Sequence, residues 1–196
     1  LRDTGYAFNV SNGGRTMFQG SENATGLGDV SFYGKYQLLQ ETGSQPALSI
    51  RVAVKAPTGD TGQVFGSGHP DAGIGLALDK TFATGWILYA NMNGIFPTGR
   101  IAGLDVQPVV SGLVAVEYLW TENFSITAQF DYYSPPFQGT GTRVLDKGVT
   151  ESVLGISYRI LPRLIWQVYG VENLDFITGS AADFTLSTVL TYRFRS

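Results

Sequence analysis

Apolar and polar residues alternate along most of the chain, and the segment near the C-terminus shows this pattern most clearly. One side of that extended segment carries Phe184, Leu186, Thr188, Leu190, Tyr192 and Phe194. The residues between them are polar except for Val189. A period of two is typical of a β-strand that has an apolar surrounding on one face and a polar surrounding on the other. No stretch predicts a helix, so we expect an all-β fold.

The same alternation recurs along the chain and predicts about ten strands, each close to the length that a tilted strand needs to cross a bilayer. We expect a single domain over residues 1–196, built as an antiparallel up-and-down transmembrane β-barrel. The expected strands cover 5–10, 32–38, 48–55, 74–79, 86–96, 110–120, 124–132, 151–160, 164–169 and 183–195.

The connections between these strands alternate between long and short. The long ones cover 11–27, 59–70, 97–105, 134–148 and 172–182, and the short ones lie near 42–44, 83–85, 121–123 and 161–162. Outer-membrane barrels have long extracellular loops and short periplasmic turns. The rhythm therefore favours the outer membrane of a Gram-negative bacterium, with both termini in the periplasm because the strand number is even.

Aromatic residues gather where the strands meet the short turns. All three tryptophans map to that end, and amphipathic rings prefer the membrane–water interface. The expected interface aromatics are Trp86, Trp120, Trp166, Tyr118, Phe124, Tyr158, Tyr192 and Phe194. Lys80 lies on the apolar face near the same end, where its stem can carry the ammonium to the interface.

Composition excludes several classes of function. Only 15% of the residues are charged, against about 25% in a typical soluble domain. The net charge of -3 argues against a nucleic-acid partner. The absence of Cys and the single His exclude disulfides and a two-His metal site within the chain. No apolar run is long enough for a transmembrane helix. We expect no cofactor, no metal and no catalytic centre.

The polar faces carry five basic and five acidic residues, which we expect to line a narrow lumen. A soluble lipocalin-like barrel would alternate equally well with its apolar face turned inward. In a membrane, each of these charges would cost about 2–4 kcal/mol at the midplane if it faced lipid. They are expected to pair in the lumen, which is either a narrow pore or a closed plug. The set comprises Lys35, Arg51, Lys55, Asp79, Glu117, Asp131, Glu151, Arg159, Asp183 and Arg193.

Two further groups are candidates for chemistry. Ser67, His69 and Asp71 could suggest a hydrolase, but they share a flexible Gly/Pro loop that nothing holds in line for catalysis. Asp131, Glu151 and Asp183 lie near the same rim, where three carboxylates could bind a cation or transfer protons. The alternatives are a solvated loop and a plain polar rim.

The segment Thr188-Val189-Leu190-Thr191-Tyr192-Arg193-Phe194 resembles the C-terminal strand of bacterial outer-membrane barrels, although Arg195-Ser196 follow the aromatic residue. This resemblance implies recognition by the barrel-assembly machinery. Leu27-Gly28-Asp29, Lys55-Ala56-Pro57-Thr58-Gly59-Asp60 and Gly66-Ser67-Gly68 loosely resemble an uncharacterised outer-membrane barrel family of unknown function. That likeness implies the fold and no activity.

The chain begins at Leu1, without a signal peptide. We interpret this as removal of a leader, or as missing N-terminal strands of a larger barrel. The expected function is a narrow polar pore for small solutes or ions. A non-conducting structural barrel in a larger cell-envelope complex is the alternative, and a surface hydrolase ranks third. Expected partners are the lipid bilayer, lipopolysaccharide and envelope-complex subunits.

Overall fold

The computed structural model describes residues 7–12, 15–21, 25–61, 65–101, 104–174 and 184–194. The all-β prediction is confirmed: nine antiparallel strands form one up-and-down sheet in the order β13-β12-β11-β10-β9-β6-β5-β4-β3. Its strands are β3 Val30–Leu39, β4 Ala47–Ala56, β5 Asp71–Thr81, β6 Trp86–Pro97, β9 Val109–Leu119, β10 Phe124–Tyr133, β11 Val149–Leu161, β12 Leu164–Asn173 and β13 Phe184–Tyr192.

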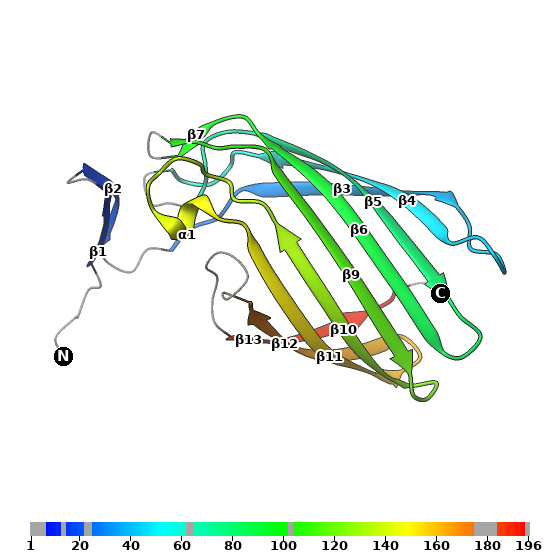
Figure 1. The fold of residues 1–196 in the computed structure, drawn as a ribbon. Coiled ribbons are helices and arrows are strands. Elements are labelled where there is room, and N and C mark those ends of the chain that lie inside the picture. Colours follow the sequence, from blue (N-terminus) through cyan, green and yellow to red (C-terminus); the bar gives the residue numbers. More distant parts are fainter. Residues whose placement is uncertain are drawn as a thin grey trace, which may run out of the picture.

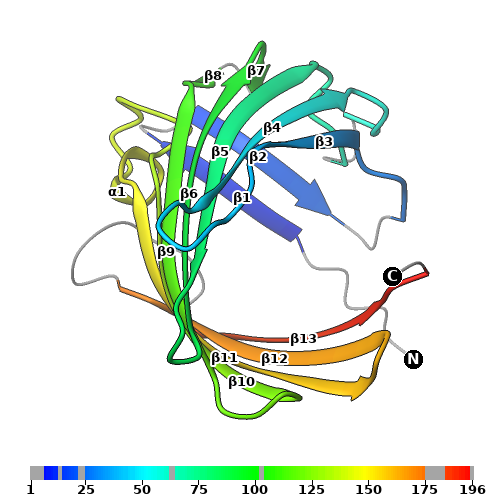
Figure 2. The same ribbon diagram turned by 90° about the vertical axis from the view of Figure 1, so that its right-hand side faces the viewer.

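The sheet curls strongly, as Figure 2 shows, but it does not close. Strands β3 and β13 are its two edges, and each pairs with a single neighbour among the described strands. Among the described strands, the up-and-down order is interrupted once, by a small hairpin of β7 (Arg100–Ile101) and β8 (Leu104–Asp105) between β6 and β9. The expected closed barrel is therefore seen as an open, curled sheet.

The N-terminal region differs from the prediction. Strand β1 (Ala7–Asn12) pairs with β2 (Arg15–Ser21), which lies inside the segment 11–27 that we expected to be a loop. This hairpin stands apart from the main sheet in Figure 1. Gly13-Gly14 is, by sequence, a two-residue connection of the kind that joins hairpin strands. That local signal, which the loop interpretation overlooked, explains why β1 pairs with β2.

Long and short connections alternate in the main sheet. The long ones cover 57–70, 98–108, 134–148 and 174–183, and the short ones cover 40–46, 82–85, 120–123 and 162–163. Successive connections of an up-and-down sheet lie at opposite ends, so the sheet has a long-loop end and a short-turn end. Figure 1 shows α1 and β7 together at the long-loop end.

The long connection 134–148 contains the one helix of the described residues, α1 (Arg143–Asp146), where we expected none. The carboxylate of Asp146 accepts hydrogen bonds from the backbone N–H groups of Thr140 (2.9 Å) and Gly141 (3.0 Å). The Thr140 bond is the main reason why the pKa of Asp146 is lowered. This single turn is a local loop structure. Within the described part of the chain, no helix is long and apolar enough to cross a membrane.

The two faces of the sheet are buried in the opposite sense to those of a water-soluble sheet. On the apolar face, Val114 is 55% and Leu154 is 68% exposed. On the polar face, Ser49 and Ala115 are each only 3% exposed. Among the described residues, no large side chain is fully buried. The described part of the chain therefore has no conventional hydrophobic core, and the shielded side of the sheet is the polar one.

Candidate functional site

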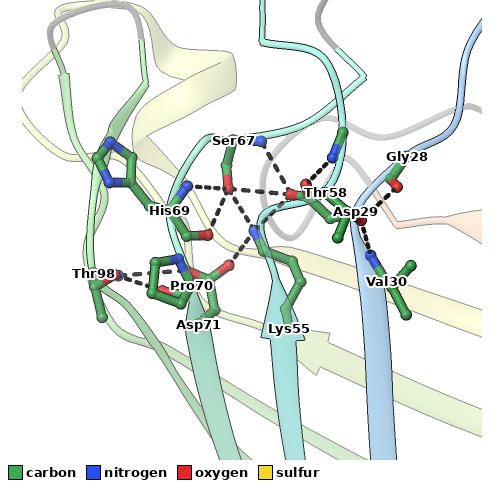
Figure 3. A network of polar contacts seen from close by, with 11 residues as sticks. Gly28, Asp29, Val30, Lys55, Thr58, Ser67, His69, Pro70, Asp71 and Thr98 are labelled. Carbon is green, nitrogen blue, oxygen red and sulfur yellow. Dashed lines mark hydrogen bonds and ion pairs between the residues drawn. The ribbon is translucent and has the colours of Figure 1, made fainter.

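A network of polar contacts joins four separate segments at the long-loop end of β3, β4 and β5 (Figure 3). Asp29, just before β3, is its centre. Its carboxylate accepts hydrogen bonds from the backbone N–H groups of Gly59 (2.9 Å) and Ser67 (3.1 Å). Lys55 Nζ lies 3.3 Å from the same carboxylate. We refer to Asp29, Lys55, Ser67 and Asp71 as the rim network.

Lys55 connects the two acidic residues of the rim network. Its ammonium forms ion pairs with Asp29 and Asp71 and donates a hydrogen bond to the Ser67 hydroxyl at 2.6 Å. Further bonds fix the surrounding chain: Val30 N–H donates to Thr58 Oγ1 (3.0 Å), and the Thr98 hydroxyl donates to the Pro70 carbonyl (2.5 Å). The contacts therefore hold the ends of β3 to β6 together.

Two glycines allow this loop to come so close to Asp29. A β-carbon on Gly66 would lie 2.6 Å from Asp29 Oδ1, and one on Gly59 would lie 2.5 Å from the Phe65 carbonyl oxygen. Real β-carbons do not make such contacts, so any larger residue at either position would move the backbone. The three sequence segments that carried the family resemblance therefore meet in one structural unit.

Asp29 is strongly held in its charged form. Hydrogen bonds from the backbone of Gly59, then from that of Ser67, and the nearby Lys55 ammonium lower its pKa from 3.8 to about 2. A carboxylate that accepts several N–H bonds behaves in this way because the bonds stabilise only the ionised form. Asp29 is thus charged at neutral pH, and the rim network that it centres acts as a structural clamp.

The Ser67, His69 and Asp71 loop does not assemble a catalytic triad. The Ser67 hydroxyl lies 3.0 Å from the backbone carbonyl of His69, not beside its ring. The imidazole packs so tightly against Gly99 that a β-carbon there would overlap it. Asp71 pairs with Lys55. In a catalytic triad the serine hydroxyl is hydrogen-bonded to the histidine ring, and the ring is hydrogen-bonded to the aspartate carboxylate. None of these side-chain contacts is formed among Ser67, His69 and Asp71 in the described structure.

A second set of polar contacts crosses the middle of the polar face. Arg51 on β4 donates a hydrogen bond to Asn93 Oδ1 on β6 at 2.7 Å, and Asn93 donates to Ser111 Oγ on β9 at 3.1 Å. Beside this row lies a hollow of about 370 Å³, whose lining includes Tyr33, Lys35 and Arg51. Hydrogen bonds of guanidinium, amide and hydroxyl side chains therefore connect strands β4, β6 and β9 across the polar face.

Three of the charges expected in the lumen, Arg51, Glu117 and Asp131, have neutral hydrogen-bond partners. Glu117 accepts hydrogen bonds from Tyr89 Oη (2.7 Å) and Ser125 Oγ (2.5 Å), and Asp131 accepts one from Gln129 (2.7 Å). Among the described residues, Lys55 is the one member of the predicted set that forms an ion pair. Hydrogen bonds therefore outnumber ion pairs among these charges in the described part of the chain.

The register places the predicted lumen charges on one face of the sheet. Lys35 lies opposite Arg51, and Asp131 lies opposite Glu151, so like charges meet in both pairs. Asp79, Glu117 and Arg159 occupy the same face nearer the short-turn end, which Arg193 follows just after β13. Asp183 lies outside the described residues. These residues do not converge on a single point.

The aromatic residues expected at an interface lie at the short-turn end. The rings of Trp86 and Tyr118 are 4.7 Å apart, and Trp120 follows at 6.2 Å from Tyr118. Phe124, Tyr158 and Trp166 form a cross-strand row on the same face, and Tyr192 contacts Phe194 at 5.0 Å. Their role at a membrane stays a prediction.

Lys80 reaches the turn 40–46 at this end. Its ammonium lies 3.1 Å from the Glu41 carboxylate and donates to the Thr42 carbonyl at 2.7 Å. Glu41 also accepts the Thr81 N–H, which is the main reason why its pKa is lowered. Lys80 therefore extends from the apolar face toward the turn, as its position predicted. A second charge on the apolar face, Glu172 at the far end of β12, was overlooked.

Several polar residues of the site were missed because they carry no charge or lie outside the strands. Asn93 and Tyr89 fall on a polar face in the alternation, which was the available signal, whereas Asn173 lay in the expected loop 172–182. Asp29 was singled out only as part of the Leu27-Gly28-Asp29 resemblance, because its partners come from loops distant in the sequence. Within the described residues, no group of three or more His, Cys, Asp or Glu side chains is arranged to hold a metal ion.

Comparison with known proteins identifies the family but adds no activity. No curated protein matches the chain. One family model matches residues 5–194, and its description is a protein of unknown function, DUF3187. That description gives no location, so the likeness to outer-membrane barrels stays a prediction. Because the match covers nearly the whole chain, the protein belongs to the DUF3187 family of unknown function.

Proposed function

We propose that this protein is an integral outer-membrane β-barrel whose polar face lines a narrow passage for small solutes or ions. The observation that carries the proposal is the inverted burial of the sheet. Large apolar side chains such as Leu154 and Leu190 are exposed, whereas small and polar ones such as Ser49 and Ser125 are shielded. Water disfavours a continuous apolar surface of this kind, but hydrocarbon accommodates it.

Three other features support a membrane setting. Long connections gather at one end of the sheet and short turns at the other, as in outer-membrane barrels. Trp86, Trp120 and Trp166 lie near the short-turn end, at a level suited to lipid headgroups. The alternating C-terminal strand with its final aromatic pair favours recognition by the barrel-assembly machinery. In this setting the outer lipid partner is lipopolysaccharide.

The passage itself is supported by the residues of the polar face. Small residues such as Gly73, Ala77 and Ala115 leave room there, and the mostly apolar lining of the adjacent hollow includes the polar side chains of Lys35, Arg51 and Asn93. Like charges at Lys35 and Arg51 face each other without a carboxylate in ion-pair contact within the described chain. Unneutralised charges in a narrow lumen attract mobile ions of opposite sign.

The unpaired edges favour a second candidate. Strands β3 and β13 each offer a free row of backbone groups within the described chain, and such edges pair with other strands. In a membrane these groups must be satisfied by closure or by additional strands. A structural barrel that is one subunit of a larger envelope complex, or one part of a larger barrel, would use the edges in this way.

Single-channel recording in planar bilayers tests the proposal, with the purified protein folded in detergent. We expect discrete conductance steps. Lys35→Glu should shift ion selectivity toward cations, whereas Lys147→Glu, in the exposed loop before β11, should shift it less. Folded protein without resolvable current would overturn the passage and favour the structural barrel. A protein that stays soluble and monomeric without detergent would overturn the membrane setting.

A further inference from the structure

Three polar side chains form a row across β10, β11 and β12 at the long-loop end of the polar face. The register pairs Asp131 with Glu151, and Glu151 with Asn173. Directly opposite residues on antiparallel strands have β-carbons about 4.5–5.5 Å apart. The three side chains are therefore neighbours on one face of adjacent strands, which lie side by side in both Figures 1 and 2.

The two carboxylates of this row lack a compensating cation. Asp131 accepts one hydrogen bond, from Gln129. No Lys, Arg or His of the described chain forms an ion pair with either Asp131 or Glu151. Like charges placed directly opposite each other in a sheet are destabilising. Something positive is needed between them if both are ionised.

Asn173 provides an independent observation. The residue is only 7% exposed, and neither polar atom of its side-chain amide has a hydrogen-bond partner in the described structure. Buried amides are almost always bonded, so this one points to a ligand. Its position opposite Glu151 places the amide next to the acidic pair.

We propose that Asp131, Glu151 and Asn173 bind a divalent cation, for which Ca²⁺ is the natural probe. Calcium takes six to eight oxygen ligands, and carboxylates, Asn side-chain carbonyls and water are its usual ones. The row supplies two carboxylates and one amide oxygen, with water completing the shell. The Asn173 amide nitrogen can then donate to the Glu151 carboxylate. One cation thus neutralises the pair and satisfies the buried amide.

Titration of the folded protein with CaCl₂ in a calcium-free detergent solution tests the site. We expect one Ca²⁺ per chain, with a Kd in the range of about 10⁻⁴–10⁻³ M found for extracellular calcium-binding modules. Asp131→Asn and Glu151→Gln should each weaken binding at least tenfold. Tb³⁺ should also bind, and its luminescence should be sensitised by Tyr133, which lies two residues from Asp131 on the same face.

Glu172→Gln is the matched control, because Glu172 precedes Asn173 on β12 but lies on the opposite, exposed face. It should leave the Ca²⁺ affinity unchanged. Asn173→Asp should bind at least as tightly as the natural protein, and Asn173→Ala should bind more weakly. The proposal is overturned if the folded protein takes up no Ca²⁺ at millimolar concentration, or if Asn173→Ala and Asn173→Asp both keep the natural affinity. These outcomes do not depend on conductance.

Discussion

Arg51 on β4 donates a hydrogen bond to Asn93 on β6, although strand β5 lies between them. The residue of β5 in register with both is Gly75. Because Gly75 has no side chain, the guanidinium can pass over the intervening strand. A contact between strands that are not neighbours therefore depends on one glycine.

Gly75→Ala should break this contact. The new β-carbon would overlap Asn93 Oδ1 and lie 2.9 Å from the Met92 carbonyl oxygen. Overpacking of this kind costs about 1–3 kcal/mol, which should appear as a lower unfolding midpoint in denaturant. Gly73→Ala is the control, since its β-carbon would meet nothing closer than 3.5 Å. Equal destabilisation by both substitutions would contradict the explanation.

Protonation of Asp29 should loosen the rim network only in strong acid. Its pKa is lowered from 3.8 to about 2 by the backbone of Gly59, the backbone of Ser67 and then Lys55. A carboxyl with a lowered folded pKa stabilises the fold fully above its unfolded pKa and loses that contribution as pH falls toward the folded value. Carboxyl-carbon NMR titration should place the Asp29 midpoint near 2. A midpoint at the unfolded value would show that the clamp does not form.

Lys55→Met separates the backbone contribution from the charge contribution at Asp29. Since the Gly59 and Ser67 N–H bonds are the larger causes, the pKa of Asp29 should rise but stay below 3.8. The same NMR titration measures it. A return of the Asp29 pKa to 3.8 would contradict this, because it would mean that the Gly59 and Ser67 N–H bonds to Asp29 are lost when Lys55 is removed.

Val114→Arg tests which medium the apolar face contacts. Val114 lies in the middle of β9 and is 55% exposed, so a water-soluble sheet would accept arginine there at little cost. Facing lipid near the midplane, the arginine should cost about 2–4 kcal/mol in refolding into vesicles. Thr127→Arg, on the polar face opposite Glu117, should cost much less. An equal loss of folding free energy in Val114→Arg and Thr127→Arg would contradict the placement of the apolar face in lipid.

The tryptophans should report one depth in the membrane. With the protein in vesicles of brominated lipids, quenching should be strongest for bromines near the headgroups, because Trp86, Trp120 and Trp166 lie near the short-turn end. Single-tryptophan variants distinguish the three. Quenching that is strongest for the deepest bromines would contradict the placement.

The alternation predicted the nine strands of the sheet and the face of most of their residues, because the side on which a strand residue lies follows a period of two. From Phe124 to Tyr132, for example, the expected strand and β10 nearly coincide. Loops and the N-terminal hairpin follow other rules. Strand β2 was missed because segment 11–27 is long and mostly polar, and Gly13-Gly14 was its one sign of a hairpin.

The site was less accessible from sequence. Lys55 was predicted to lie on the polar face, but its partners depend on how distant loops approach the strand ends, and the partner Asp29 lies 26 residues earlier in the chain. The missing signal for Asn173 was burial, which depends on the curl of the whole sheet. Contacts between loops therefore need the three-dimensional structure.

Every pairing within the main sheet joins strands that follow each other along the chain or flank one small hairpin. Such a sheet has a low contact order until its edges meet, so its strands can assemble one hairpin at a time. Joining β3 to β13 would bring together residues from opposite ends of the chain and would be the slowest step. If the sheet closes, the hydrogen bonds between β3 and β13 would be the last to form during assembly. Until then both edge strands would be accessible to an assembly factor.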